Sequence, residues 1–197
     1  MRLYHLPNTR STRVLWLLEE IGAPYELTLL TKEDRKGAEH LGRHPLGRVP
    51  VIDEDGGFVL ESLAICLHVA DLHPDAALIP PVGTHERALV YQWSAFAMTE
   101  LEAAILEVFA ARRKEDGERT AAGVDRFRAA ATVVEQALEG REYLVGSRFS
   151  VGDLICGAVL IFARRAELTE GLPNVAAYLD RLEARPARQR ATAIGVD

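Results

Sequence analysis

Two short stretches of the chain, Val49-Pro50 and Glu61-Ser62, carry groups suited to binding a small peptide. A cis proline in a tight turn before an apolar strand would leave the Val49 N–H and C=O unpaired. Such an edge can pair with an extended peptide. Glu61 can hold an ammonium group, and Ser62 at a helix N-terminus offers a hydroxyl and a free N–H to a carboxylate. The two stretches therefore predict a site for a small peptide with a free amino-acid head group.

A second group of reactive side chains lies where the first strand turns into the first helix. Thr9, Ser11 and Thr12 place hydroxyls at a helix N-terminus, which carries roughly half a positive charge. A sulfur brought there ionises more easily, and a hydroxyl that donates to it stabilises the thiolate further. No cysteine occupies this turn, so a reacting thiol must arrive with the ligand. The alternative for each hydroxyl is a simple helix cap.

Composition narrows the class of protein. The 197 residues are 48% hydrophobic, enough for a substantial core, and the net charge of −6 argues against a nucleic-acid surface. The two cysteines, Cys66 and Cys156, stand far apart in apolar runs, which indicates buried thiols rather than a disulfide or a metal cluster. We find no signal-peptide pattern and no apolar run of the ~20 residues that span a bilayer. We expect a cytoplasmic protein with no metal, nucleic-acid or membrane partner.

Hydrophobic spacing predicts an α/β domain over residues 1–76. Strands are expected at residues 2–6, 25–30, 49–53 and 58–60, and helices at residues 11–21 and 62–72. The helix between the first two strands favours their parallel pairing. Asp55-Gly56-Gly57 predicts a hairpin between the last two strands.

A proline-rich linker over residues 77–84 leads to an all-helical domain at residues 85–197. Helices are expected at residues 85–113, 118–139 and 154–166, with a fourth that opens at Pro173 and ends before Pro186. The third is apolar nearly all round and should be the buried centre of the domain, with Asp153 capping its start. The tail beyond Pro186 is ambiguous.

Four motifs in this order resemble the cytosolic glutathione S-transferases over nearly the whole chain. They are the segments at residues 13–20, 45–51, 61–65 and 149–153. The resemblance implies a thioredoxin-like first domain and an all-helical second domain. It also implies a homodimer, in which each first domain packs on the partner's second domain, and glutathione as co-substrate.

On this resemblance, the peptide is glutathione. Its cysteinyl part would pair with the backbone of Val49 beside Pro50, and its γ-glutamyl head would bind Glu61 and Ser62. Arg48 is expected either to reach the glycyl carboxylate or simply to be exposed.

The resemblance also suggests which hydroxyl activates the thiol. In the Ser-type members it lies about four residues before the arginine matched by Arg13, a position held here by Thr9. Threonine can donate the same hydrogen bond, although its β-branch restricts the rotamer. Ser11 is the alternative donor. Tyr4 is a third candidate by analogy with the Tyr-type members, but it lies inside the first strand and is expected to be a packing residue. His44, where the family often has Asn, is expected to be a solvated loop residue rather than a ligand contact.

The sequence thus predicts a transferase that joins the glutathione thiolate to small hydrophobic electrophiles. The electrophile pocket is expected between the domains, lined by Phe96, Thr99 and Glu100. The alternative for these three side chains is a place in the core or in an interface. A glutathione-dependent disulfide reductase or peroxidase is one alternative, since Asn8 and Thr9 would suit a site that holds two thiols. A non-catalytic scaffold that binds glutathione or another ligand is the other.

Overall fold

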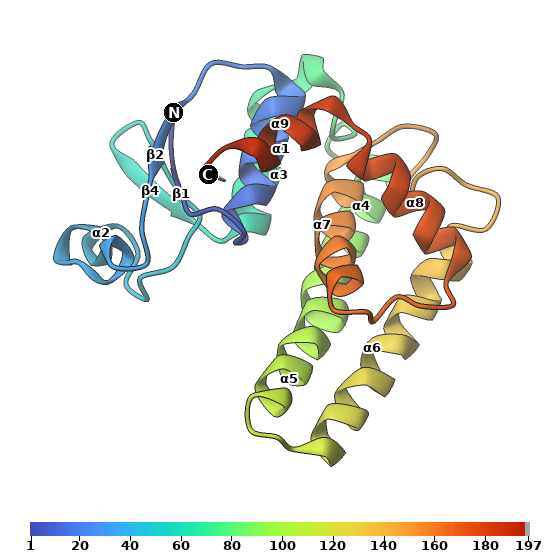
Figure 1. The fold of residues 1–197 in the computed structure, drawn as a ribbon. Helices are drawn as coiled ribbons and strands as arrows, with labels where there is room; N and C mark the ends of the chain where they lie inside the picture. The colour runs from blue at the N-terminus through green and yellow to red at the C-terminus, as the bar shows by residue number, and fades with distance from the viewer. Residues whose placement is uncertain (196–197) are drawn as a thin grey trace. The chain divides into compact units, whose positions relative to one another are not determined.

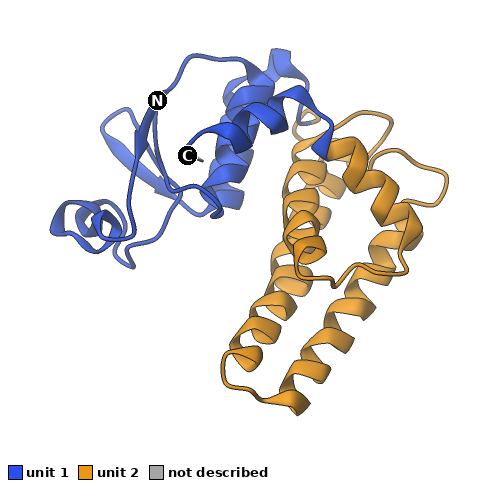
Figure 2. Ribbon diagram, viewed as in Figure 1, with its two compact units in different colours: residues 1–79, 183–197 blue, residues 80–182 orange. Residues whose placement is uncertain are grey.

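The computed structural model describes residues 1–195, which form two compact units (Figure 1). Figure 2 shows residues 1–79 and the tail from Glu183 in one unit, and Pro80–Leu182 in the other. The first unit is the predicted thioredoxin-like domain, and the second is the predicted helical domain. The sequence assigned the whole of residues 85–197 to the helical domain, whereas the contacts of the structure group the tail with the first unit.

The first unit is built on a four-stranded mixed sheet in the order β2-β1-β3-β4. The strands are β1 (Arg2–His5), β2 (Glu26–Leu29), β3 (Val51–Glu54) and β4 (Gly57–Leu60). β1 and β2 are parallel, as predicted, and β3 is antiparallel to both β1 and β4. Tyr4 lies opposite Val51, which lies opposite Leu60. The end of β1, the start of β3 and the end of β4 therefore meet at one edge of the sheet.

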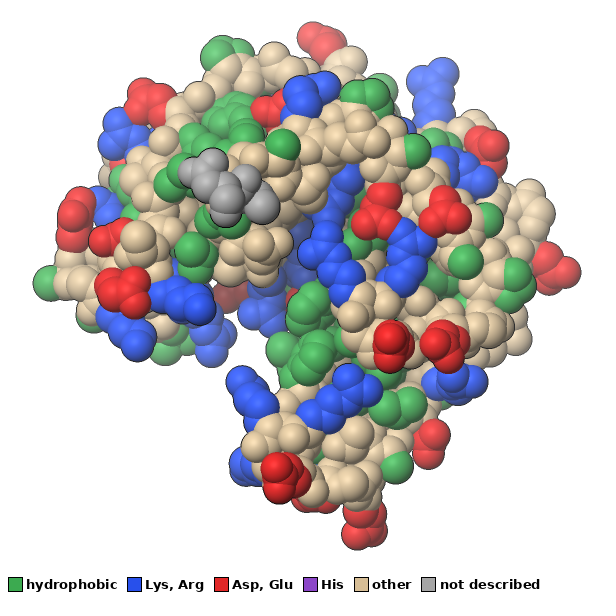
Figure 3. All heavy atoms as spheres, viewed as in Figure 1, with side chains coloured by type: hydrophobic (Ala, Val, Ile, Leu, Met, Phe, Trp, Pro, Cys, Tyr) green, Lys and Arg blue, Asp and Glu red, His purple; other side chains and the backbone are tan. Residues whose placement is uncertain are grey.

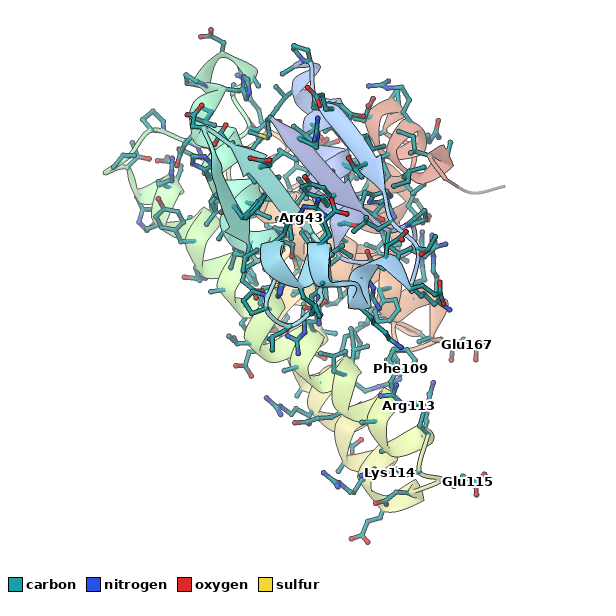
Figure 4. The ribbon with its side chains drawn as sticks, turned by 90° about the vertical axis from the view of Figure 1, so that its left-hand side faces the viewer. Arg43, Phe109, Arg113, Lys114, Glu115 and Glu167 are labelled. Atoms are coloured by element: carbon teal, nitrogen blue, oxygen red, sulfur yellow. The ribbon has the colours of Figure 1, made fainter. Side chains whose placement is uncertain are left out.

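Two helices cover one face of this sheet. α1 (Ser11–Ile21) and α3 (Ser62–Leu72) contact each other, and α1 packs on β1. The apolar spacing of α1 turns its large side chains inward, and Gly22 ends the helix at φ +71°. The short helix α2 (Ala38–Arg43) lies on the opposite face (Figure 4). There the guanidinium of Arg43 lies 4.3 Å from the ring centre of Tyr4, which is buried as predicted.

The tail joins the first unit through ion pairs with α1. Its helix α9 (Pro186–Ala193) contacts α1 along its length. Arg185 donates two hydrogen bonds to the Glu20 carboxylate, at 2.6 and 2.8 Å, and Arg190 donates to Glu19 at 2.6 Å. Because Glu19 and Glu20 are largely buried, these pairs are screened less by water than ordinary surface pairs.

The second unit is helical throughout. Its elements are α4 (His85–Phe96), the π-helical turn η3 (Ala97–Glu102), α5 (Ala103–Arg112), α6 (Gly117–Ala137), α7 (Val151–Arg165) and α8 (Pro173–Glu183). The single helix predicted over residues 85–113 is therefore interrupted by a π-helical turn. The prediction that α7 forms the buried centre is confirmed, because most of its side chains are inaccessible.

Helix α7 begins at a closed network of hydrogen bonds around Asp153. Its Oδ1 accepts from the Leu144 N–H at 2.8 Å and from the Tyr178 hydroxyl at 3.1 Å. Its Oδ2 accepts from the N–H and the hydroxyl of Ser150, at 2.9 and 2.8 Å. Burial raises the pKa of Asp153, and these hydrogen bonds oppose that rise. The predicted capping role of Asp153 is confirmed.

Both cysteines are buried free thiols, as predicted. Burial raises the pKa of Cys66 to about 12 and also raises the pKa of Cys156. Neither sulfur is therefore a thiolate near neutral pH, and neither has access to solvent.

The accessible surface carries charges of both signs. In Figure 3, Lys and Arg side chains lie among Asp and Glu side chains over the face in view, with apolar side chains between them. No helix within residues 1–195 is long and apolar enough to cross a membrane.

Candidate active site

One edge of the sheet brings the predicted site segments together. At this edge Tyr4 pairs with Val51, and Val51 with Leu60. Leu6, just beyond β1, and Leu60 pack against a small core cluster that contains Val49. The turn after β1, the Val49-Pro50 segment and the start of α3 are therefore neighbours.

The Val49-Pro50 bond is cis, as the sequence predicted. Within residues 1–195, neither the N–H nor the C=O of Val49 pairs with another backbone group. The side chains of Val49 and Pro50 are buried, whereas Arg48 is exposed. A backbone donor and acceptor are thus available to an extended ligand at residue 49.

Hydrogen bonds among its own residues stabilise the loop before Val49. His40 donates from Nε2 to the Arg48 carbonyl at 2.9 Å. Gly47 has φ +58°, a conformation that favours glycine. His44 is only 4% exposed, and its Nδ1 accepts from the Leu46 N–H at 3.1 Å. The prediction of a solvated His44 was therefore wrong, because an irregular loop has no periodicity from which burial can be inferred. Burial lowers the pKa of His44.

The start of α3 carries an exposed carboxylate next to a hydroxyl that is hydrogen-bonded to a buried guanidinium. Glu61 is exposed and adopts φ +69°, a strained conformation for a non-glycine residue. Ser62 is buried, and its Oγ accepts a hydrogen bond of 3.3 Å from the Arg13 guanidinium of α1. The first turn of α3 holds no acidic residue. A buried cation and a helix N-terminus therefore both favour an anion at Ser62.

Arg13 is a site residue whose position the sequence did not predict. In the sequence, Arg13 was used only to align the family motif. In the structure its side chain is 6% exposed and extends from α1 to a hydrogen bond with Ser62 of α3. The available signal was a charged residue within the otherwise apolar run of α1, since a buried arginine needs a partner.

The hydroxyls of the first turn form a chain of hydrogen bonds that leads inward to His5. Thr9 Oγ1 donates to the Leu6 carbonyl at 2.6 Å and lies 2.8 Å from Ser11 Oγ. Ser11 Oγ accepts from the Leu6 N–H at 3.1 Å and lies 2.7 Å from His5 Nδ1. Ser11 and His5 have no exposed surface, whereas Thr9 is partly exposed. Of the two predicted catalytic residues, only Thr9 has exposed surface.

His5 is the other site residue that the sequence did not identify. Burial lowers its pKa to about 4, so the ring is neutral at pH 7. Within the described residues, its Nε2 is buried without a hydrogen-bond partner. The available signal was a histidine at the end of a strand, directly before a turn rich in hydroxyls.

The three residues predicted to line the electrophile site belong to the second unit. Phe96 ends α4 and stacks edge-on against Trp93, with 5.7 Å between ring centres. Thr99 and Glu100 belong to the π-helical turn, where the exposed Thr99 hydroxyl donates to the Ala95 carbonyl at 3.1 Å. Such turns are frequent at functional sites. These residues offer an apolar ring and polar groups within one helical stretch.

Comparison with known proteins identifies the family. Residues 1–71 match the model of the glutathione S-transferase N-terminal domain, and residues 117–181 match that of the C-terminal domain. The glutathione S-transferase GstA of Escherichia coli O157:H7 is 29% identical, over 97% of this chain and 96% of its own. Glutathione S-transferase 4 of Zea mays is 31% identical, over 91% of this chain and 85% of its own.

A solved structure extends the similarity to three dimensions. A sphingomonad glutathione S-transferase complexed with glutathione is 27% identical and superposes with a TM-score of 0.87 over 98% of both chains. The sequence motifs, the cis peptide beside an unpaired edge, and these matches agree. The chain belongs to the glutathione S-transferase family.

Proposed function

We propose that this glutathione S-transferase binds glutathione at the edge of its sheet and joins the glutathione thiolate to a small hydrophobic electrophile. The observation that supports this most strongly is the meeting of three features at one edge. These are an unpaired backbone at Val49, a helix start at Ser62 beside a buried guanidinium, and a hydroxyl chain that ends at the partly exposed Thr9. The sphingomonad relative was solved with glutathione bound.

Each part of the tripeptide has a complementary group. The γ-glutamyl carboxylate binds the N–H and hydroxyl of Ser62, where the charge of Arg13 supports it. The γ-glutamyl ammonium pairs with the exposed carboxylate of Glu61. The cysteinyl N–H and C=O pair with Val49, and the exposed Arg48 reaches the glycyl carboxylate. This assignment makes Glu61, Ser62, Val49 and Arg48 binding residues.

The thiol is activated at the turn after β1. The Thr9 hydroxyl donates a hydrogen bond to the sulfur, while the N-terminus of α1, whose first turn holds no acidic residue, favours the thiolate. The thiol proton passes to water. The exposure of Thr9 and the burial of Ser11 support Thr9 as the direct donor, with Ser11 behind it.

The transfer step forms one carbon–sulfur bond. The thiolate electron pair attacks an electrophilic carbon, and a leaving group departs with its bonding pair, or water protonates the product of an addition. Phe96, Thr99 and Glu100 line the site of the electrophile. Holding both reactants in place removes the entropic cost of their encounter.

A homodimer is part of the same proposal. Family membership supports it, with each first domain packed on the second domain of its partner. Light scattering during size-exclusion chromatography measures the mass directly, and a mass of one chain would contradict the dimer.

The proposed function is tested by conjugation assays with a panel of electrophiles, together with ultraviolet titration of the thiolate of bound glutathione. We expect turnover, and a bound thiol that ionises at lower pH than free glutathione. Ser62→Ala should weaken glutathione binding by roughly tenfold, because a charge-assisted hydrogen bond is lost, and should leave thiol ionisation unchanged.

Two results would replace the transferase assignment. Tight glutathione binding without turnover of any electrophile would indicate a binding scaffold. Reduction of disulfides or hydroperoxides without conjugation would indicate the redox alternative.

A further inference from the structure

We propose that His5 is a positioning residue that sets the direction of the hydrogen bonds in the turn, so that the Thr9 hydroxyl is left to donate to the glutathione sulfur. The proposal rests on the proposed function for the identity of the ligand. His5 has no exposed surface and therefore acts through Ser11 rather than on the ligand.

The tautomer of His5 follows from its two nitrogens. Nδ1 lies 2.7 Å from Ser11 Oγ, whereas Nε2 is buried and has no partner within residues 1–195. A proton on Nε2 would create a buried N–H without an acceptor, and such orphaned donors are rare in folded proteins. A proton on Nδ1 is used in the bond to Ser11 and leaves only a bare lone pair at Nε2. The geometry therefore favours the Nδ1–H tautomer of a neutral ring.

With this tautomer, both acceptor positions of the Ser11 hydroxyl are occupied. A hydroxyl has two acceptor positions and one proton. The Leu6 N–H occupies one acceptor position at 3.1 Å, and the His5 Nδ1–H occupies the other at 2.7 Å. Thr9 Oγ1 is only 2.8 Å from Ser11 Oγ, yet Ser11 has no acceptor position left for it. A hydrogen bond between the two hydroxyls must therefore run from Ser11 to Thr9.

The Thr9 proton is thereby directed away from Ser11. In the ligand-free protein it goes to the Leu6 carbonyl at 2.6 Å. When Thr9 turns to a sulfur, Ser11 can donate to the same carbonyl, 3.1 Å away, so that the carbonyl keeps a partner. With the opposite tautomer, Ser11 would donate to His5, and its free acceptor position would be open to the Thr9 hydroxyl. The Thr9 hydroxyl would then be drawn inward, away from the ligand.

The first test reads the tautomer directly. Nitrogen NMR of the full chain labelled at histidine, recorded at neutral pH without glutathione, distinguishes Nδ1–H from Nε2–H, and the spectrum of His5→Asn assigns the His5 signals. We expect the Nδ1–H form. An Nε2–H form would overturn the proposal. Because no ligand is present, this result is independent of the proposed function.

The second test compares two amides of different reach. Asparagine can place an N–H near the position of Nδ1, whereas glutamine places it near Nε2, away from Ser11. At neutral pH, His5→Gln should lower the thiolate fraction of bound glutathione by up to roughly tenfold, which corresponds to one pKa unit, and His5→Asn should stay near the wild type. His68→Gln, a histidine paired with Glu54 on the same unit, is the matched control and should change nothing.

A double variant separates positioning from general damage to the fold. In a Thr9→Ala background, His5→Gln should have no further effect on the thiolate fraction, because the hydroxyl that His5 directs is absent. An undiminished effect there, or equal effects of the asparagine and glutamine variants, would overturn the positioning role. A wild-type thiol that ionises as in free glutathione would instead refute the proposed activation at Thr9.

Discussion

Two buried polar networks within residues 1–195 differ in whether they are closed. Around Asp153 both carboxylate oxygens accept two hydrogen bonds each, and every member of the network is buried. The chain of His5, Ser11 and Thr9 instead ends in a His5 nitrogen that has no partner among residues 1–195 and in the partly exposed Thr9. A closed network contributes to stability alone, whereas an open one keeps a donor for something that is not yet bound.

The difference follows from what each network must do. The Asp153 network fixes the start of α7, the most buried helix of its unit, so an unfilled position there would only lower stability. The turn after β1 must instead change partners when a ligand arrives. Substitutions that break the first network should therefore act on unfolding, and those that break the second should act on chemistry.

The largest effect is expected from Asp153→Ala. It leaves the N–H groups of Leu144 and Ser150 buried without their acceptor, and it leaves the Tyr178 hydroxyl with only the main-chain carbonyl of residue 153, 3.2 Å away. We expect a loss of about 3–5 kcal/mol in the free energy of unfolding, measured by urea titration. Asp153→Asn should also destabilise, since its NH₂ group would face one of these donors. A loss below about 1 kcal/mol for the alanine variant would show that the Asp153 hydrogen bonds contribute little to the stability of the fold.

The buried His5 of the open network should make the free energy of unfolding depend on pH. The folded pKa of His5 is lowered to about 4 from an ordinary value of 6.5, so between these values the unfolded chain binds more protons than the folded one. Stability is therefore full above about pH 6.5 and falls as the pH drops toward 4, by about 2–3 kcal/mol from this group. His5→Asn removes the titration but keeps a donor.

Urea titrations of the wild type and of His5→Asn, at several pH values in this window, check the prediction. The difference in unfolding free energy between the two should shift with pH in favour of the variant as the pH falls. His44 also has a lowered pKa and contributes to the acid sensitivity of both proteins, so the difference isolates His5. Parallel curves would mean that the His5 ring is not buried in its neutral form.

Thr9→Ala should separate activity from stability. Loss of a hydrogen bond to a charged sulfur should lower kcat/KM for conjugation by about 10–100-fold, whereas the unfolding free energy should change by less than about 1 kcal/mol because Thr9 is partly exposed. Thr9→Ser keeps the hydroxyl and should keep most of the activity. If Thr9→Ala were fully active, the donor would have to be sought elsewhere in the turn.

Regular patterns explain what the sequence revealed. The apolar spacing of α1 and α3 predicted both helices from their first residues, and the helix between β1 and β2 predicted their parallel pairing. An X-Pro step before an apolar strand predicted the geometry at Val49-Pro50. In each case the residues that decide the structure are neighbours in the chain.

The features that the sequence did not predict depend on contacts between distant or irregular segments. The positive φ of Glu61, the burial of His44 in its loop and the reach of Arg13 to Ser62 depend on how segments meet in space. The bond between His5 and Ser11 likewise requires the particular turn after β1, in which Asn8 adopts φ +59°.

The smallest effect is expected from Tyr178→Phe, which tests whether the Asp153 and His5 networks are independent. Tyr178→Phe removes one of the two donors to Asp153 Oδ1, and the Leu144 N–H still occupies that oxygen at 2.8 Å. We expect a loss of only about 1 kcal/mol in the free energy of unfolding, measured by urea titration, and no change in the thiolate fraction of bound glutathione.

A closed network tolerates the loss of one donor because its acceptor stays occupied. In the open network, the loss of the His5 N–H frees an acceptor position on Ser11 that the Thr9 hydroxyl can occupy, so a change of similar size there should appear in the chemistry. If Tyr178→Phe also altered the ionisation of the bound thiol, the two networks would be coupled, and the distinction between them would fail.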